Sequence, residues 1–373
     1  MTAGQPELAA PVCLDDVRRM AKETLAPDIW AFVEGGSGAE TTLAANRAAF
    51  DSVALLPRVL TGVSTSDTTG SLVHSEVAMP VAIAPMAYQR LVHPDGELAA
   101  ASAARVAGVP FVLSTLSSCR IEEVTAIGAT TWFQLYWLRD DAQVEELVRS
   151  ADQLGCAALV VTVDVPIMGR RHRDMRNEFV LPSDVQAVNL HPGSTRETHV
   201  RTQGASAVAT HTSAAFAPGL TWWDLERLRE WTKLPLVVKG ILDPRDARLA
   251  VQAGADAIVV SNHGGRQLDG AVPSIVALQA AVQEVADARA VLLDSGVRSG
   301  TDVLRALALG ASGVLVGRPV LWGLAAAGER GVAQVLSLLQ AELREAMILA
   351  GCADLVAAGR LGTREVGFDA PYD

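Results

Sequence analysis

Short apolar runs alternate along this chain with longer stretches in which apolar residues recur at helical spacing. The runs are rich in Val, Ile and Leu and are continuous, which is typical of parallel strands buried on both faces. They occupy residues 81–85, 111–115, 131–135, 158–164, 235–240, 257–261, 290–294 and 313–317. Ala-rich stretches such as 96–108 and 245–255 lie between them and predict helices.

Strand and helix repeated about eight times predict a closed TIM-type (β/α)8 barrel, an α/β fold. An open doubly wound sheet is the alternative, but it uses fewer strands and usually carries a glycine-rich dinucleotide turn after the first. No such turn follows residues 81–85. We expect one barrel domain over residues 1–373, with a helical N-terminal extension over 1–75.

The connection between the fourth and fifth predicted strands is much longer than the others. Its last part has the pattern of an ordinary helix, but residues 166–220 are polar and mixed in Gly, Ser, Thr and Ala. We expect a long lid loop there, mobile and partly disordered, over the active-site face. A zinc site from His191, His199 and His211 is the alternative; the spacing is loose and no acid or cysteine is placed to help, so we predict no metal.

Charge and composition narrow the class of protein. Lys plus Arg number 31 against 42 Asp plus Glu, a formal net charge of −11, which argues against nucleic-acid binding. The four cysteines are widely spaced, without a disulfide or metal pattern. The sequence shows neither a signal-peptide pattern nor an apolar stretch suited to spanning a bilayer. We expect a cytoplasmic protein without membrane contact.

Polar residues gather where the predicted strands end, and in TIM barrels the chemistry lies at the carboxyl ends of the strands. The candidates on strands two to six are Ser114, Gln134, Tyr136, Thr162, Asp164, Lys239 and Ser261. The lysine at an apolar strand end is costly unless it is paired with something anionic, such as a negatively charged cofactor ring.

Turns containing glycine follow the last two predicted strands, over 294–298 and at 317–318. Arg298 and Arg318 lie in these turns. Backbone N–H groups of a tight turn can hold phosphate oxygens, and an arginine fork can pair with them. A surface salt bridge is the alternative for each arginine, but the glycines favour a phosphate site of the usual barrel type.

The segment SNHGGRQLDG (261–270) carries the clearest catalytic pattern. Its glycines leave the backbone free to present His263 and Arg266 to one pocket. The arginine can hold a carboxylate by two hydrogen bonds, and the histidine can take a proton from the adjacent carbon or its hydroxyl. Asp164 can orient that imidazole; the alternative is that its carboxylate only caps or stabilises its own loop by hydrogen bonds. Either arginine of the 170–171 pair can be a second carboxylate anchor.

These motifs resemble the FMN-dependent 2-hydroxyacid oxidase family, which includes glycolate oxidase, lactate oxidase and mandelate dehydrogenase. The resemblance runs from about residue 14 to 365, and its segments are 133–137, 162–171, 261–270, 292–303 and 316–319. It implies that His263 is the active-site base and Asp164 its carboxylate partner. Arg266 and Arg171 would hold the substrate carboxylate, and Tyr136 would hydrogen-bond the substrate near its hydroxyl.

The resemblance also implies FMN across the barrel mouth. The flavin ring would meet the backbone of Pro85, Met86 and Ala87. Around it would stand the side chains of Ser114, Gln134, Thr162, Lys239 and Ser261. The phosphate would lie on Asp294, Ser295, Gly296, Val297 and Arg298, and on Gly317 and Arg318.

Three positions depart from the family pattern. Phe32 replaces a tyrosine that helps bind the substrate carboxylate, and Leu116 replaces the tryptophan that narrows the pocket of glycolate oxidases. Ser295 replaces a glycine of the phosphate turn, and we expect the site to survive. Space at Leu116, with Phe32 and Met168 nearby, suggests an aromatic substrate. Three further segments are similar to those of members that oxidise 4-hydroxymandelate, over 85–97, 169–179 and 201–212.

The resemblance therefore implies oxidation of (S)-4-hydroxymandelate to 4-hydroxyphenylglyoxylate, with O2 reduced to H2O2. A mandelate or lactate-type dehydrogenase that uses a quinone or a carrier protein is the first alternative. An FMN-dependent isomerase and a flavin-binding barrel without catalysis are two others. The complete set of His263, Arg266 and Arg171 argues against both of these. Barrels of this kind often form tetramers, so we expect a homo-oligomer.

Overall fold

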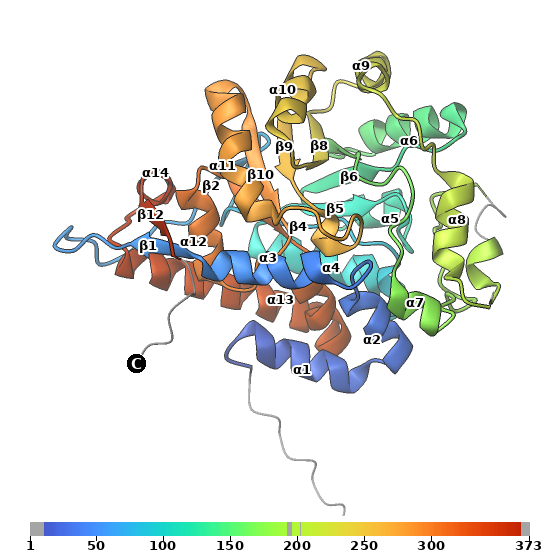
Figure 1. Ribbon diagram of the computed structural model, residues 1–373, viewed down its shortest axis with the longest axis horizontal. Coiled ribbons are helices and arrows are strands. Elements are labelled where there is room, and N and C mark those ends of the chain that lie inside the picture. The colour runs from blue at the N-terminus through green and yellow to red at the C-terminus, as the bar shows by residue number, and fades with distance from the viewer. Residues whose placement is uncertain (1–10, 192–195, 202, 367–373) are drawn as a thin grey trace, which may run out of the picture.

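A computed structural model of the protein describes residues 11–191, 196–201 and 203–366 (Figure 1). At its centre eight parallel strands close into a barrel in the order β4-β5-β6-β7-β8-β9-β10-β11. The predicted TIM barrel is confirmed, and each predicted run coincides with one strand apart from small differences at the ends. The strands are β4 (Val81–Ile83), β5 (Phe111–Ser114), β6 (Thr131–Leu135), β7 (Ala158–Thr162), β8 (Leu236–Ile241), β9 (Ala257–Val260), β10 (Ala290–Asp294) and β11 (Gly313–Val316).

Helices on the outside connect these strands. Several begin at a side chain that caps the first turn: Asp140, Asp243 and Ser299 each accept a hydrogen bond from a backbone N–H within the first turn. The outer helices are α4 (Gly96–Ala107), α5 (Ile121–Thr125), α6 (Asp141–Gln153), α9 (Trp222–Trp231), α10 (Pro244–Gln252), α11 (Ser274–Val285), α12 (Gly300–Ala308) and α13 (Arg318–Leu349).

Alternate strand residues point into the barrel and form layers. The apolar layer consists of Ala82, Val112, Trp132, Val160, Val237, Val259 and Leu292. The hairpin of β2 (Gly70–Leu72) and β3 (Ser75–Val77) packs into the same cluster. On six of these strands, the residue two positions further along also points into the barrel, and it is polar. These are the buried Ser114, Gln134, Thr162, Lys239, Ser261 and Asp294. The strand period thus places a polar layer directly at the carboxyl mouth.

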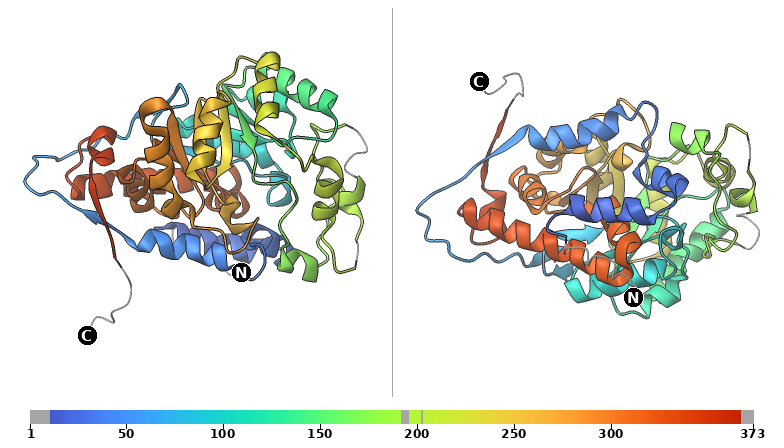
Figure 2. Two further views of the ribbon diagram at one scale, coloured as in Figure 1. Left: turned by 45° about the horizontal axis from the view of Figure 1, so that its top comes forward. Right: turned by 90° about the horizontal axis from the view of Figure 1, so that it is seen from below.

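The N-terminal extension contains the predicted helices, α1 (Leu14–Thr24), α2 (Pro27–Glu34) and α3 (Thr41–Asp51). α1 packs along α13 beneath the barrel (Figure 2), whereas α3 contacts the short helix η3 (His263–Gly265) at the mouth. The pattern did not predict the short strands. Besides the β2–β3 hairpin, β1 (Val53–Leu56) pairs antiparallel with β12 (Gly362–Glu365).

The long segment 166–220 contains helices in its described part, which its polar composition did not predict. They are α7 (His172–Arg176), η2 (Arg196–His199) and α8 (Ala207–Ala215). α7 and α8 lie at the end of the molecule opposite β1 and β12 (Figure 1). Phe179 and Leu181 of this segment are buried in the main core. Movement of the segment as a lid stays a prediction.

The histidines of this segment have separate partners. His191 Nε2 lies 3.1 Å from a Glu146 carboxylate oxygen, and His199 Nδ1 lies 3.1 Å from the Leu181 carbonyl. Within the described residues, no group of three or more His, Cys, Asp or Glu side chains could hold a metal ion. No helix in the same residues is long and apolar enough to cross a membrane.

Candidate active site

A cleft with an empty volume of about 1140 Å³, counted out to its open mouth, lies at the carboxyl ends of the barrel strands. Most predicted site residues line it: Phe32, Pro85, Met86, Ala87, Leu116, Tyr136, Met168, Arg171, Lys239, His263, Arg266, Asp294, Ser295, Gly296, Val297, Arg298, Gly317 and Arg318. The other predicted residues, Ser114, Gln134, Thr162, Asp164 and Ser261, are not part of this lining. The structure thus brings the residues predicted from distant segments together at one mouth.

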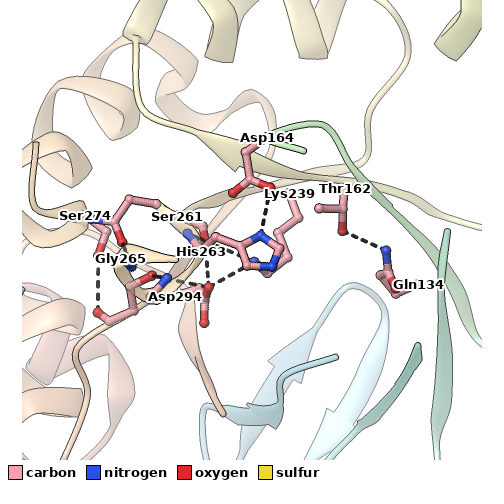
Figure 3. A network of polar contacts seen from close by, with 12 residues as sticks. Gln134, Thr162, Asp164, Lys239, Ser261, His263, Gly265, Ser274 and Asp294 are labelled. Atoms are coloured by element: carbon pink, nitrogen blue, oxygen red, sulfur yellow. Dashed lines mark hydrogen bonds and ion pairs between the residues drawn. The ribbon is translucent and has the colours of Figure 1, made fainter. Parts of the chain in front are cut away.

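His263 and Asp164 form a close pair at this mouth (Figure 3). Nδ1 of the imidazole lies 2.9 Å from Oδ1 of the carboxylate, and the side chains are 19% and 13% exposed. The backbone of His263 is left-handed, with φ of 59°, and its N–H donates to Ser261 Oγ at 3.0 Å. Gly264, with φ of 66°, continues this turn. The glycine next to the histidine therefore lets the loop leave β9 sharply and present the imidazole to the cleft.

Gln267 fixes the position of Asp164, and the sequence prediction did not include it. Its Nε2 donates to the carbonyl oxygens of Asp164 at 2.9 Å and Ile167 at 2.8 Å. The N–H of Gly169 donates to Gln267 Oε1 at 2.9 Å, and a Cβ at Gly169 would collide with the Arg266 carbonyl. The loop after β7 is therefore attached to the loop after β9 through one amide side chain.

The protonation states at this pair follow from desolvation. Burial lowers the pKa of His263, and the neighbouring Asp164 carboxylate opposes that shift without cancelling it. Burial raises the pKa of the Tyr136 phenol, and the Asp164 charge adds to the effect. Tyr136 also stacks on Phe216, with ring centroids 4.6 Å apart. At neutral pH the site therefore presents a neutral imidazole and a protonated phenol.

Arg171 and Arg266 lie on the same aromatic surface. Their guanidinium carbons are 6.0 Å and 5.2 Å from the centroid of the Phe32 ring, which stacks on Phe179 at 4.5 Å. Arg266 Nη1 also donates to the carbonyls of Phe32 at 2.8 Å and Gly35 at 2.7 Å, at the C-terminus of α2. At the position where the family has a tyrosine, a phenylalanine thus supports both arginines by cation–π contact.

Arg298 and Arg318 lie in the predicted phosphate region. Burial lowers the pKa of Arg298 to about 10 and that of Arg318 to about 9; repulsion from Arg266 and Arg298 adds to the shift at Arg318. The Arg298 guanidinium lies 5.0 Å from the Trp322 ring centroid. Several partly buried cations around one cleft repel each other unless anions join them. This arrangement fits a bound phosphate group.

The turn that would hold the phosphate has an unusual backbone. Ser295 has a φ of 84° and Gly296 a φ of 93°. Ser295 Oγ accepts a hydrogen bond from the N–H of Gly264 at 2.8 Å. A Cβ at Gly296 would lie 2.8 Å from the ring of Phe50. The left-handed φ at both positions suits glycine, and the hydrogen bond from the Gly264 N–H compensates for the serine at 295.

Lys239 has an anionic partner in the polar layer (Figure 3). Its Nζ lies 3.0 Å from Asp294 Oδ2 and 3.0 Å from Ser261 Oγ, and Ser261 Oγ donates to Asp294 at 2.6 Å. Burial lowers the pKa of Lys239, but the Asp294 and Asp164 charges outweigh it, so the net pKa is raised. The Asp294 carboxylate therefore pairs with the lysine, whereas the backbone that follows Asp294 forms the turn predicted to hold the phosphate.

A second chain of hydrogen bonds runs through the same layer. Ser114 Oγ donates to Gln134 Oε1 at 3.1 Å, and Gln134 Nε2 donates to Thr162 Oγ1 at 3.0 Å. The two networks form a layer of fixed donors and acceptors below the mouth, and Lys239 and Asp294 of this layer line the cleft. These two side chains present a cation and a carboxylate to the cleft, which suits the polar edge of a heteroaromatic ring such as the flavin.

Further residues that line the cleft were not predicted: Val33, Ala84, Tyr88, Val165, Val208, Thr212, Phe216, Gly264, Gln267, Leu315, Val316 and Leu321. Tyr88 is fully buried with a left-handed φ of 56°, which for a bulky residue marks a constrained position. Val208, Thr212 and Phe216 come from the segment 166–220. Nothing in their spacing distinguishes them from other apolar or hydroxyl residues.

The fold and this site define a barrel whose mouth carries several arginines beside a histidine–carboxylate pair. The family model for FMN-dependent dehydrogenases matches residues 21–362. The chain therefore belongs to the FMN-dependent dehydrogenase family, and FMN is its cofactor. It is an enzyme that oxidises 2-hydroxy acids.

Several characterised proteins are similar to this chain over nearly its whole length. A 4-hydroxymandelate oxidase from Amycolatopsis orientalis is 55% identical, covering 95% of this chain and 98% of the relative. An L-lactate oxidase from Nostoc sp. is 47% identical, covering 93% of this chain and 96% of the relative. The crystal structure of a mandelate oxidase with (S)-4-hydroxymandelic acid matches with a TM-score of 0.93 and 55% identity, covering 95% of this chain and 99% of that chain.

Proposed function

We propose that the protein oxidises (S)-4-hydroxymandelate to 4-hydroxyphenylglyoxylate and reduces O2 to H2O2. The substrate loses two protons and two electrons, and dioxygen takes up both pairs to give H2O2. The observation that carries the proposal is the position of His263 in one cleft with Arg171 and Arg266, beside the apolar wall at Leu116. The 4-hydroxymandelate oxidase from Amycolatopsis orientalis, at 55% identity, supports the aromatic substrate.

The two arginines hold and orient the substrate carboxylate. Arg266 is fixed by its bonds to the C-terminus of α2, and both guanidinium groups rest on Phe32. Two cations in a partly desolvated site give an anion strong, directional hydrogen bonds. With the carboxylate held at these arginines, the substrate hydroxyl and its carbon are presented to Tyr136 and His263.

His263 takes the proton that the reaction releases. Its lowered pKa keeps the imidazole neutral and able to accept a proton at neutral pH. Asp164 accepts the Nδ1–H bond, which leaves Nε2 for the substrate, and it stabilises the imidazolium once the proton has moved. The Tyr136 phenol stays protonated and donates a hydrogen bond to the substrate oxygen.

FMN, when bound, accepts the two electrons from the substrate and delivers them to the acceptor. Lys239, held by Asp294 and Ser261, lines the cleft and would balance negative charge on the ring. Arg298, Arg318 and the turn at Ser295 would hold the phosphate. These side chains fix where the cofactor lies relative to His263.

The wall of the cleft suits an aryl group. Leu116 is 4% exposed and lines the cleft where glycolate oxidases have tryptophan. Met168, Val208 and Phe216 add apolar surface from the segment 166–220. A wall of aliphatic and aromatic side chains favours burial of a phenyl ring over a methyl group, because the larger apolar area leaves water.

The test is a substrate and acceptor panel on the purified holoenzyme. Glycolate, lactate and both enantiomers of mandelate and 4-hydroxymandelate are assayed with peroxide and oxygen consumption as readouts. The proposal predicts the highest kcat/KM for (S)-4-hydroxymandelate, with one peroxide formed per oxygen consumed. Preference for lactate would overturn the aromatic assignment. Turnover with a quinone or dye but without peroxide would instead show a dehydrogenase.

A further inference from the structure

A buried carboxylate lies next to Arg171, one of the two arginines proposed to bind the substrate carboxylate. Asp174 is on α7, one turn after Arg171, and its side chain is 1% exposed. Its Oδ2 is 3.9 Å from Arg171 Nη1, which is an ion-pair distance longer than a hydrogen bond. Within the described residues, neither Asp174 oxygen accepts a hydrogen bond. The carboxylate is thus buried close to a cation without the hydrogen bonds that usually stabilise a buried charge.

Asp174 faces a second cavity rather than the active-site cleft. This cavity is partly open to solvent, has an empty volume of about 530 Å³ counted out to its opening, and lies between residues 168–175 and 204–210. Arg171 lines both this cavity and the cleft, whereas Asp174 lines only the second cavity. The Arg171 side chain is therefore shared between an internal carboxylate on one side and the proposed position of the substrate carboxylate on the other.

The other charges around Asp174 are already paired or belong to the site. Arg171, Arg266 and Arg173 act on it as cations and Glu40 as an anion. Arg173 is held in an ion pair with Glu40. Of the neighbouring helices, α2 carries Glu34, which accepts hydrogen bonds from Arg18 and Trp322, and α8 carries the buried His211.

Burial and charge set the protonation of Asp174. Burial raises the pKa of this carboxyl, and the attraction of Arg171 only partly offsets the rise. The Asp174 charge in turn holds up the pKa of both arginines, which burial lowers, to about 9 in Arg171. A second anion at the arginines would oppose ionisation of Asp174, because two carboxylates then share the same cations.

We propose that Asp174 is a positioning residue that competes with the substrate carboxylate for the charge of Arg171 and Arg266. The affinity of the site for carboxylates then falls as Asp174 ionises, and binding of a carboxylate is accompanied by proton uptake at Asp174. The Asp174 carboxylate thereby keeps Arg171 and Arg266 protonated when no substrate is bound. The same competition lowers the affinity of the two arginines for the carboxylate of the product. The inference rests on the proposed role of Arg171 and Arg266 in binding the substrate carboxylate.

The test measures the binding of phenylacetate, a carboxylate without a hydroxyl to oxidise, to the holoenzyme between about pH 5 and about pH 8, where the ligand is ionised. Binding is followed by the perturbation of the flavin absorbance, and proton uptake by calorimetry in buffers of different ionisation enthalpy. Asp174→Asn removes the charge, and Asp174→Glu keeps it. The control Asp184→Asn removes an exposed charge from the same segment.

At the alkaline end, Asp174→Asn should bind phenylacetate about tenfold more tightly than the wild type, which corresponds to about one pKa unit of coupling. The two proteins should converge at the acidic end, and proton uptake should be smaller in the variant. Titration of His263 occurs in both proteins, so the difference between the profiles isolates Asp174. Asp174→Glu and Asp184→Asn should keep the wild-type dependence of phenylacetate affinity on pH. In Asp174→Asn, kcat for the substrate should change less than KM.

Weaker or unchanged binding in Asp174→Asn, with the wild-type pH slope, would overturn the inference. An Arg171→Met variant separates this failure from failure of the proposed function. If Arg171→Met binds phenylacetate as tightly as the wild type, Arg171 is not a carboxylate anchor and that part of the proposed function fails. If it loses binding while Asp174→Asn is unchanged, only the competition fails. The isosteric Asn removes no hydrogen bond from the described structure, so a folded variant is expected.

Discussion

His263 and Asp164 are joined across the barrel mouth although 99 residues separate them in the chain, with Nδ1 and Oδ1 2.9 Å apart. Asp164 follows β7 and His263 follows β9, so β8 lies between the two strands that carry the pair. Gln267 fixes the distance because it binds the backbone at Asp164 from the loop that carries His263. The proposed base is thus oriented by the fold itself before any substrate binds.

Replacement of Asp164 by asparagine should lower the rate of substrate oxidation about 10²- to 10⁴-fold, because the imidazolium loses its counter-charge and the ring its orientation. Asp164 raises the pKa of His263 against the effect of burial. Without that charge the pKa of His263 falls further, so the acidic limb of kcat/KM should move to lower pH. A pH profile for both proteins checks this, and an acidic limb that does not move would contradict the pairing.

Replacement of Arg298 by glutamine should weaken FMN binding about 10- to 100-fold, because a charged hydrogen bond to phosphate contributes about 1.5–3 kcal/mol. Titration of the apoenzyme with FMN, followed by the quenching of flavin fluorescence, gives the Kd. The control Arg245→Gln removes an exposed arginine that is paired with Asp243. Equal Kd values for the two variants would remove Arg298 from the cofactor site.

Replacement of Leu116 by tryptophan should change the substrate preference. The larger ring would fill the space beside the cleft, so kcat/KM for 4-hydroxymandelate should fall about 10- to 200-fold relative to that for lactate. Leu116→Met has a similar volume and should keep the wild-type ratio. The ratio of kcat/KM for the two substrates is the measurement. A ratio that is unchanged in the tryptophan variant would show that Leu116 does not limit the aryl position.

Ser295 allows a test of backbone strain in the phosphate turn. Ser295→Ala keeps a side chain at a φ of 84° and loses the acceptor for the Gly264 N–H, so the apoenzyme should be destabilised by about 1–2 kcal/mol. Ser295→Gly loses the same acceptor but relieves the left-handed strain by about 1 kcal/mol. In thermal melting of the apoenzymes, Ser295→Ala should have a lower Tm than both the wild type and Ser295→Gly. An alanine variant as stable as the wild type would show that the Gly264 bond contributes little.

The barrel and most of the proposed site follow from the sequence because both depend on local patterns. Continuous apolar runs such as 158–164 fit strands that are buried on both faces, and the strand period directs every second residue inward. Residues at the strand ends, such as Lys239, therefore meet at one mouth. His263 and Arg266 were predictable because a glycine-rich turn directly follows a strand.

The segment 166–220 was less predictable because tertiary packing decides its structure. Its start is dense in charge, with RRHRDMR over 170–176, and such a pattern ordinarily indicates an exposed loop. Arg171 and Asp174 are nevertheless buried, since each lies close to a group of opposite charge. The role of Phe216 in the cleft depends on its stacking against Tyr136, which no sequence spacing encodes.

The most direct test of the central claim is anaerobic mixing of the holoenzyme with (S)-4-hydroxymandelate. The account predicts that the yellow flavin absorbance bleaches within the turnover time in the wild type. A His263→Gln variant that still binds FMN should bleach at least about 10²-fold more slowly, because the base is missing. Yellow absorbance that persists with mandelates and lactate alike, or equal bleaching in the His263→Gln variant, would contradict the account.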